Sequence, residues 1–320
     1  MTQPMEDLDH DALIAQLRDP DAGNRQFALM QLEDLASADS VPALIAVLDD
    51  EDAVVRRLAI GLLEELGDAA AVPAIIERLL DDDPEVQDAA AGVLRDFRGP
   101  GAAEAMLAQI QHPAPAVRRG VILGLREQKE PRALSPLIAA LEDSAPEVRR
   151  EAVISLAYLR LADSIEPLRK RLSDPDADVR RITVGALNYW NSPALLADFS
   201  AALRDSDWRV RAESAIVLGR SALSGAIPGL RASLSDSYWQ VQKEAIAALG
   251  RLSAVAAVPE LVKFLAHDMA ELRRTAAYAL GEIKAERAVP ALRALSNDPD
   301  VEVRKASARA LEAIGAPAKE

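Results

Sequence analysis

The most regular feature of the chain is an apolar residue followed by arginine, which returns every 31 residues. We call this two-residue pattern the mark of a repeat. Its second residue is position 0, from which all other positions of the repeat are counted. Ten marks follow one another without insertion or deletion, with Asn or Gln at three places: Asn24-Arg25, Val55-Arg56, Val86-Gln87, Val117-Arg118, Val148-Arg149, Val179-Arg180, Val210-Arg211, Val241-Gln242, Leu272-Arg273 and Val303-Arg304. A fixed period of this length predicts a solenoid of stacked repeats.

The second repeat shows how each unit folds. Pro42 opens an apolar run over residues 43–48, and its missing N–H costs nothing in a first helical turn, so this run predicts helix A. An acidic turn ends the run, and Asp52 is a good N-cap for a second helix, helix B, over residues 54–66. Gly67 ends helix B as its C′ residue. Each repeat is therefore predicted to be an antiparallel helical hairpin.

The apolar positions keep one register throughout. Positions −12 and −8 carry the apolar face of helix A, position +7 is Leu in all ten repeats, and position +3 is mostly Ala or Ser. Positions −1, +3, +7 and +10 share one face of helix B. No hairpin of this size buries that face alone, so stacking must supply the core. We predict an all-α solenoid of ten repeats over residues 11–315, in one continuous domain spanning 1–320 with tails at 1–10 and 316–320.

The motifs V-P, D-x-D-x-x-V-R-R and A-L-G recur in blocks such as VPALIAVLDDEDAVVRRLAIGLLEELG and VPELVKFLAHDMAELRRTAAYALGEI. This register resembles the HEAT-like repeats of the phycobilisome (PBS) lyase type, over essentially the whole chain. The resemblance implies a curved, right-handed α-solenoid. It implies no single function, because such repeats serve scaffolds, chaperones, lyases and other enzymes.

Composition narrows the range of functions. The chain has no cysteine, which excludes disulfides, thiol catalysis and Cys-ligated zinc. Residues 1–100 carry 23 acidic and 7 basic residues, whereas residues 101–320 carry 28 and 30, so only the first third is strongly acidic. That third should repel nucleic acid and anionic membranes. With no signal-like N-terminus and no apolar run of about 18 residues, a cytoplasmic protein is expected.

Two columns of charge run along the array. Position −6 is Asp in eight repeats and position 0 is Arg in eight, which predicts a structural ladder in which the Asp caps a turn and an Arg holds it. His112 and His267 replace the Asp in repeats 4 and 9, and we interpret them as turn residues. With three scattered His and no His-Glu pair, we predict no metal site, no catalytic residues and no cofactor.

A second stripe of helix B, at positions −3, −2, +1, +5 and +9, is not used by the core. In the resembling repeats this stripe lines the concave surface. Nine of the eleven aromatic residues lie between residues 158 and 278, and Trp208 and Trp239 occupy the same position in adjacent repeats, so they are expected to lie side by side. Exposed Trp with Arg is typical of interface hot spots. The predicted binding residues are Tyr158, Tyr189, Trp208, Arg209, Trp239, Lys243, Arg251, Arg274 and Tyr278.

We therefore predict a non-catalytic scaffold or adaptor that uses the helix-B surface of repeats 5–9 to hold a helix or extended segment of another protein. The alternative is a maturation factor similar to the phycobilin lyases, which handles a tetrapyrrole through aromatic and Arg–propionate contacts. A duplex-binding glycosylase-like role is disfavoured by the net charge of −14. The oligomeric state is not predicted.

Overall fold

In the computed structural model, residues 9–316 are described, and they form helical hairpins with no strand among them. The chain divides into two compact units, Met1–Ser164 and Ile165–Glu320, each with five repeats. The boundary falls between repeats 5 and 6. Most of the two predicted tails lies outside the described residues, and the continuity of the ten-repeat array stays a prediction.

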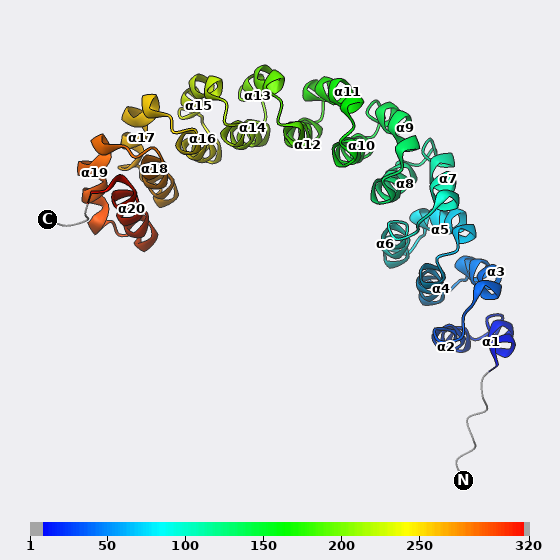
Figure 1. Cartoon of the computed structure of the whole chain (residues 1–320). Coiled ribbons are helices and arrows are strands. Elements are labelled where there is room, and N and C mark those ends of the chain that lie inside the picture. The colour runs from blue at the N-terminus through cyan, green and yellow to red at the C-terminus, as the bar shows by residue number, and fades with distance from the viewer. Residues whose placement is uncertain (1–8, 317–320) are drawn as a thin grey trace, which may run out of the picture. The chain divides into compact units, whose positions relative to one another are not determined.

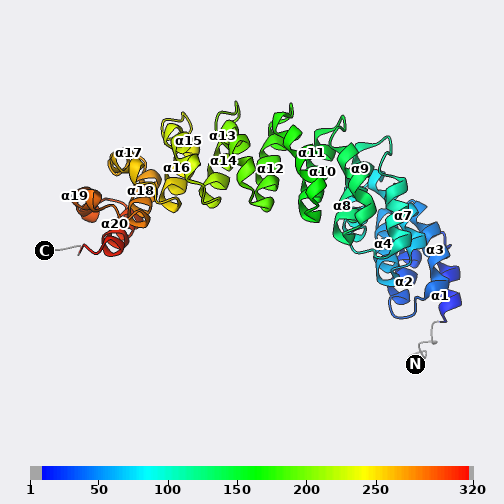
Figure 2. The same ribbon diagram turned by 45° about the horizontal axis from the view of Figure 1, so that its top comes forward.

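Odd-numbered helices are the A helices and even-numbered helices are the B helices, and within each unit the two sets form separate layers (Figures 1 and 2). The first unit contains α1 (His10–Gln16), α2 (Ala22–Leu32), α3 (Val41–Ala46), α4 (Ala53–Leu66), α5 (Val72–Glu77), α6 (Pro84–Val93), α7 (Pro100–Ala108), α8 (Pro115–Gln128), α9 (Leu134–Ala140) and α10 (Pro146–Leu159).

The second unit repeats this pattern with α11 (Ile165–Lys170), α12 (Ala177–Leu187), α13 (Leu196–Ala202), α14 (Trp208–Arg220), α15 (Ile227–Ser233), α16 (Trp239–Arg251), α17 (Val258–Phe264), α18 (Ala270–Glu282), α19 (Val289–Ala294) and α20 (Val301–Ile314). Short 3-10 turns precede or extend most A helices, for example η2 (Val47–Asp49) after α3, and η8 (Asn188–Trp190) extends α12. None of the helices in residues 9–316 combines the length and apolar character needed to cross a membrane.

The predicted helix signals of the second repeat are confirmed. The Asp52 carboxylate accepts the backbone N–H of Val55 at 3.0 Å, which caps α4. Gly67 follows α4 in the left-handed conformation with φ of 63°. Both devices satisfy backbone groups that a helix end leaves without partners.

The core follows the predicted register. The leucines at position +7 are buried in all ten repeats, from Leu32 to Leu311. At position +3, the Ser214 and Ser307 hydroxyls donate to the helix-A carbonyls of Phe199 and Leu292, both at 2.5 Å. The small residues at this position thus let the two helices of a hairpin pack closely without an unsatisfied polar atom.

The side chain at position −6 caps the same turn in every repeat. Its oxygen, or the Nδ1 of His112 and His267, accepts the backbone N–H of the residue two places on, at 2.8–3.1 Å. The interpretation of both histidines as turn residues is confirmed. The Arg or Gln at position 0 donates to the carbonyl of position −6 in its own repeat, at 2.6–2.9 Å in all ten repeats.

The same arginines also tie neighbouring repeats together. Six of them form ion pairs with the position −6 Asp of the next repeat at 2.5–2.8 Å: Arg25–Asp50, Arg56–Asp81, Arg118–Asp143, Arg180–Asp205, Arg211–Asp236 and Arg273–Asp298. At the two junctions where position 0 is Gln, the next repeat carries His112 or His267 in place of Asp. Arg and Asp are thus exchanged together at these two junctions, so neither junction places an unpaired carboxylate opposite a Gln.

The Arg273–Asp298 pair gives a test of this coupling. Nε and Nη2 of Arg273 each donate to one carboxylate oxygen of Asp298, both at 2.8 Å. These hydrogen bonds hold the pKa of Asp298 below its usual range. Arg273→Gln should lower the free energy of unfolding by about 3 kcal/mol, because it leaves a buried carboxylate unpaired. The double variant Arg273→Gln/Asp298→His recreates a Gln–His junction. Its loss in the free energy of unfolding should therefore be smaller than the sum of the two single losses, by at least about 1 kcal/mol. Urea unfolding of the four proteins checks this, and strict additivity would contradict the coupling.

The B helices of the second unit approach one another through glycine at position +8. A Cβ added at Gly219, Gly250 or Gly281 would lie 2.7, 2.7 or 2.9 Å from the Cα of an alanine in the next B helix: Ala248, Ala279 and Ala310, respectively. A real Cβ does not tolerate these distances, so the three glycines are required by the packing. The first unit is built differently, because position +8 of its first three repeats holds Glu33, Glu64 and Arg95.

One substitution made at two glycines tests this difference. Gly250→Ala should destabilise the protein by about 1–3 kcal/mol, because α16 and α18 must move apart. Gly61→Ala lies inside α4, where an added Cβ meets no atom within 4 Å, so it should stabilise the protein by up to about 1 kcal/mol through helix propensity. Thermal unfolding followed by circular dichroism compares the two. Equal effects of the two changes would contradict the close packing.

Candidate functional site

The predicted binding residues are divided between the two units. Tyr158 lies in the last turn of α10 in the first unit, where the Lys129 ammonium sits 5.8 Å from the centre of its exposed ring. The other eight residues belong to the second unit: Tyr189 lies in η8 and the other seven lie in α14, α16 and α18. The candidate site described below is therefore a surface of the second unit, and Tyr158 is a separate exposed aromatic residue.

The strongest feature of this surface is an aromatic stack at the start of α14 and α16. Trp208 is the first residue of α14, and its ring stacks on Tyr238, with centroids 5.6 Å apart and planes 13° apart. The Arg211 guanidinium lies 5.6 Å from the centre of the Tyr238 ring. Arg211 is itself held by Asp236 in the ladder, so the ladder fixes the position of the stack.

The ring that stacks on Trp208 belongs to Tyr238, a residue outside the predicted set. The expectation that Trp208 and Trp239 lie side by side stays a prediction. Tyr238 is the N-cap residue of α16, in a place where the preceding repeat has the capping carboxylate of Asp207. In the 31-residue register, residue 208 is equivalent to residue 239, whereas the stacking contact joins Trp208 to Tyr238, 30 residues later. The signal in the sequence was an aromatic residue where Asp is usual, which sequence reasoning missed.

The stack is open to solvent. Tyr238 is 45% exposed and the neighbouring Trp239, the first residue of α16, is 37% exposed. Trp208 is half-buried. We name Trp208, Tyr238 and Trp239 the aromatic edge, since all three lie where the B helices begin.

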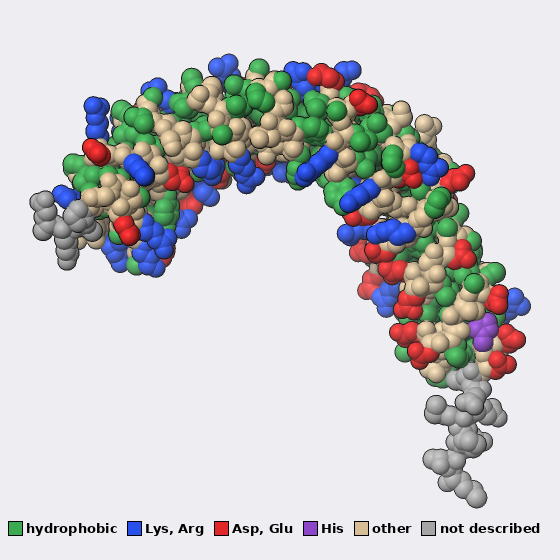
Figure 3. Space-filling model, in the orientation of Figure 1, with side chains coloured by type: hydrophobic (Ala, Val, Ile, Leu, Met, Phe, Trp, Pro, Cys, Tyr) green, Lys and Arg blue, Asp and Glu red, His purple; other side chains and the backbone are tan. Residues whose placement is uncertain are grey.

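Three of the four predicted cations are already paired. Arg209 contacts Asp178 at 3.1 Å and Asp207 at 2.9 Å. Lys243 lies 3.4 Å from Glu271, which also holds Arg274 at 2.6 Å. Two of these pairs join neighbouring repeats, so the cations brace the surface; they are not free for a ligand. Basic side chains along the B-helix side of the second unit are visible in Figure 3.

Tyr189, Arg251 and Tyr278 occupy other parts of the surface. Tyr189 lies in η8 and is 60% exposed, and Arg251 is the last residue of α16. Because a helix rises 1.5 Å per residue, Arg251 lies about 18 Å from Trp239 along α16. Tyr278 is partly exposed in the middle of α18, and its hydroxyl lies 3.3 Å from Nη1 of Arg309. The predicted residues of the second unit are thus spread over a broad surface, and two of them, Trp208 and Trp239, belong to the aromatic edge.

Two carboxylates that lie over glycines complete the surface. Glu213 leans over Gly185 of the preceding B helix, and Glu282 leans over Gly250 in the same way. Burial raises the pKa of both carboxyl groups, and nearby arginines, including Arg251 beside Glu282, oppose this shift. These groups can accept hydrogen bonds from a bound chain. In residues 9–316, no three His, Asp or Glu residues come together in a way that would hold a metal ion.

Helical hairpins stacked through a ladder, with an exposed B-helix surface, define an α-solenoid repeat protein. The chain matches the HEAT repeats over residues 10–95, 73–157, 102–188, 165–250 and 258–319, and it belongs to this family. The PBS lyase HEAT-like repeat matches residues 241–267. Both matches confirm the resemblance found in the sequence.

Solved structures share the fold. An engineered protein is 22% identical, with 96% of this chain and 99% of that chain covered and a TM-score of 0.54. YibA of Escherichia coli is 21% identical, with 84% and 100% covered and a TM-score of 0.56. Kap95p, which binds RanGDP, is 17% identical with a TM-score of 0.65; 95% of this chain is covered, but it spans only 50% of Kap95p. No curated protein matches the chain.

Proposed function

We propose that the protein is a non-catalytic scaffold whose second unit holds a segment of a partner protein on its B-helix surface. HEAT-repeat arrays commonly serve as protein-binding scaffolds and are generally not enzymes. The observation that carries the proposal is the aromatic edge. Three large rings lie together at the surface of α14 and α16, and exposed Trp and Tyr are the residues that most often anchor a protein interface.

The geometry of the edge favours tight binding. Trp208 and Tyr238 are held by their stacking and by Arg211, so they lose little side-chain freedom when a partner covers them. The paired cations Arg209, Lys243 and Arg274 form the polar rim expected around such an anchor. A helix or extended segment that places an apolar side chain on the edge fits this arrangement.

The paired cations also weigh against the tetrapyrrole alternative. Propionate groups would have to displace Asp178, Asp207 and Glu271 from Arg209, Lys243 and Arg274. That exchange gains little, because one carboxylate replaces another at the same cation. The aromatic edge, by contrast, is available to a protein side chain without breaking any pair.

The test is a pull-down from native lysate with tagged wild type and the Trp208→Ala/Tyr238→Ala variant, read by mass spectrometry. We expect a specific partner to fall by about tenfold or more in the variant, because interface aromatic residues often contribute over 1.4 kcal/mol each. Val255→Ala is the matched control, since Val255 is exposed in the second unit away from the edge. Its partner recovery should equal that of wild type.

Circular dichroism and thermal unfolding establish that both variants are folded. Equal recovery of every partner by wild type and the folded Trp208→Ala/Tyr238→Ala variant would contradict the proposed surface. A tetrapyrrole absorbance band in the wild-type eluate would support the lyase-like alternative instead.

A further inference from the structure

The first unit carries an exposed apolar surface of its own on its B helices. Phe27 and Met30 on α2 are 46% and 59% exposed. Met30 is at position +5 of the first repeat, and the same position holds Gly61 and Gly92 in the next two repeats. The surface therefore begins with the large apolar side chains of Phe27 and Met30 and continues to Gly61 and Gly92, which have no side chain.

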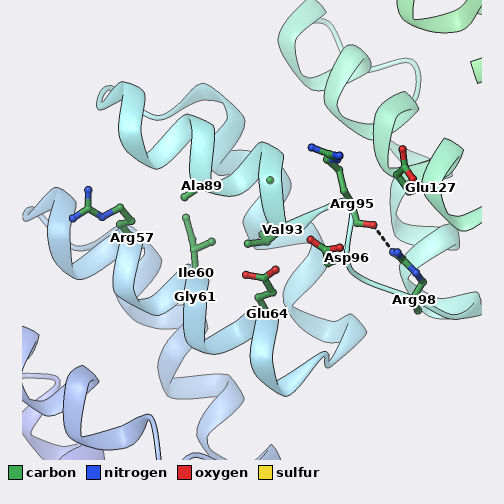
Figure 4. A pocket seen from close by; sticks show the side chains of 11 residues that line it. Arg57, Ile60, Gly61, Glu64, Ala89, Val93, Arg95, Asp96, Arg98 and Glu127 are labelled. Atoms are coloured by element: carbon green, nitrogen blue, oxygen red, sulfur yellow. Dashed lines mark hydrogen bonds between the residues drawn. The ribbon is translucent and has the colours of Figure 1, made fainter. Parts of the chain in front are cut away.

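The missing side chains open a groove. It has a volume of about 520 Å³ and lies over α4, α6 and the end of α8, with Gly61, Gly92, Ile60, Ala89 and Val93 along its floor (Figure 4). A Cβ added at Gly61 or Gly92 would meet no atom within 4 Å. These glycines are not needed for close packing between helices, unlike Gly250, so the space above them is available to a ligand.

Acidic side chains line one side of this surface at positions +8 and +9. They are Glu33, Asp34, Glu64, Glu65 and Asp96, all exposed, and none has an ion pair within residues 9–316. Glu64 and Asp96 point toward each other in the groove (Figure 4). Burial raises the pKa of the Glu64 carboxyl group, and repulsion from Asp96 adds to the shift.

The position of these carboxylates on their helices adds to the unfavourable charge. Glu64 and Glu65 lie in the last turn of α4, and Glu33 follows the last residue of α2. The end of a helix carries partial negative charge, which favours basic residues there. Neither α2 nor α4 has a basic residue in its last turn, whereas α14 and α16 end with Arg220 and Arg251. A cationic partner would supply the missing charge.

We infer that the B-helix face of α2, α4 and α6 is a second docking surface, which takes a basic amphipathic helix from a partner protein. The apolar side of that helix packs on Phe27 and Met30 and fills the groove over Gly61 and Gly92. Its Lys and Arg side chains meet Glu64, Glu65 and Asp96. Three arginines also line the groove. Arg57 pairs with Glu85, Arg98 donates to the carbonyl of Phe97, and Arg95 lies next to Asp96 in the chain. The five carboxylates at positions +8 and +9 outnumber these three cations. This inference is independent of the proposed surface on the second unit.

A fluorescein-labelled amphipathic peptide of Leu and Lys, about 18 residues or five turns long, tests the surface by fluorescence anisotropy with the full chain. We expect wild type to bind it and Gly61→Leu to weaken binding by about tenfold, since the new side chain fills the groove. Gly61→Leu should keep its fold, because leucine is the better helix former and the space is open.

Charge is tested by two matched double variants. Glu64→Gln/Glu65→Gln removes two carboxylates from the surface and should weaken binding by about fivefold. Glu77→Gln/Glu104→Gln makes the same change in net charge on the A helices α5 and α7 and should change binding by less than about twofold. Equal losses in the two variants, or unchanged binding by Gly61→Leu, would overturn the inference. The Trp208→Ala/Tyr238→Ala variant should bind the peptide as wild type does, which keeps this result separate from the proposed function.

Discussion

Six of the eight junctions within the two units depend on one arrangement, in which the position −6 Asp caps its own turn and pairs with the arginine of the preceding repeat. The Asp298 carboxylate, for example, accepts the backbone N–H of Asp300 and both Nε and Nη2 of Arg273. Because the carboxylate has two oxygens, one residue satisfies a turn and joins two hairpins. The spacing between B helices, and hence the surface they present, follows from this contact.

The two units use that common frame in different ways. In the second unit, glycines at position +8 bring the B helices together, and paired cations and aromatic rings cover the surface. In the first unit, the glycines Gly61 and Gly92 lie at position +5, where they leave space above the helices and not between them. The same residue type thus closes one surface and opens the other, depending on its position in the repeat.

Much of this was predictable from the sequence because it repeats. The hairpins, the buried leucines of position +7, the ladder and the role of His112 all follow from the 31-residue register. The stack of Trp208 on Tyr238 did not, because it joins different positions of two repeats. The pairing of Lys243 with Glu271 was missed for the same reason. The groove was missed because it forms where Gly61 and Gly92 have no side chain.

The central claim is that a partner protein covers the aromatic edge of the second unit. Photo-crosslinking in native cells tests it most directly, with benzoylphenylalanine in place of Tyr238 or, as a control, in place of the exposed Val255. The account predicts a discrete crosslinked species from position 238 and none from position 255. Crosslinks that form equally at both positions, or only at 255, would contradict it.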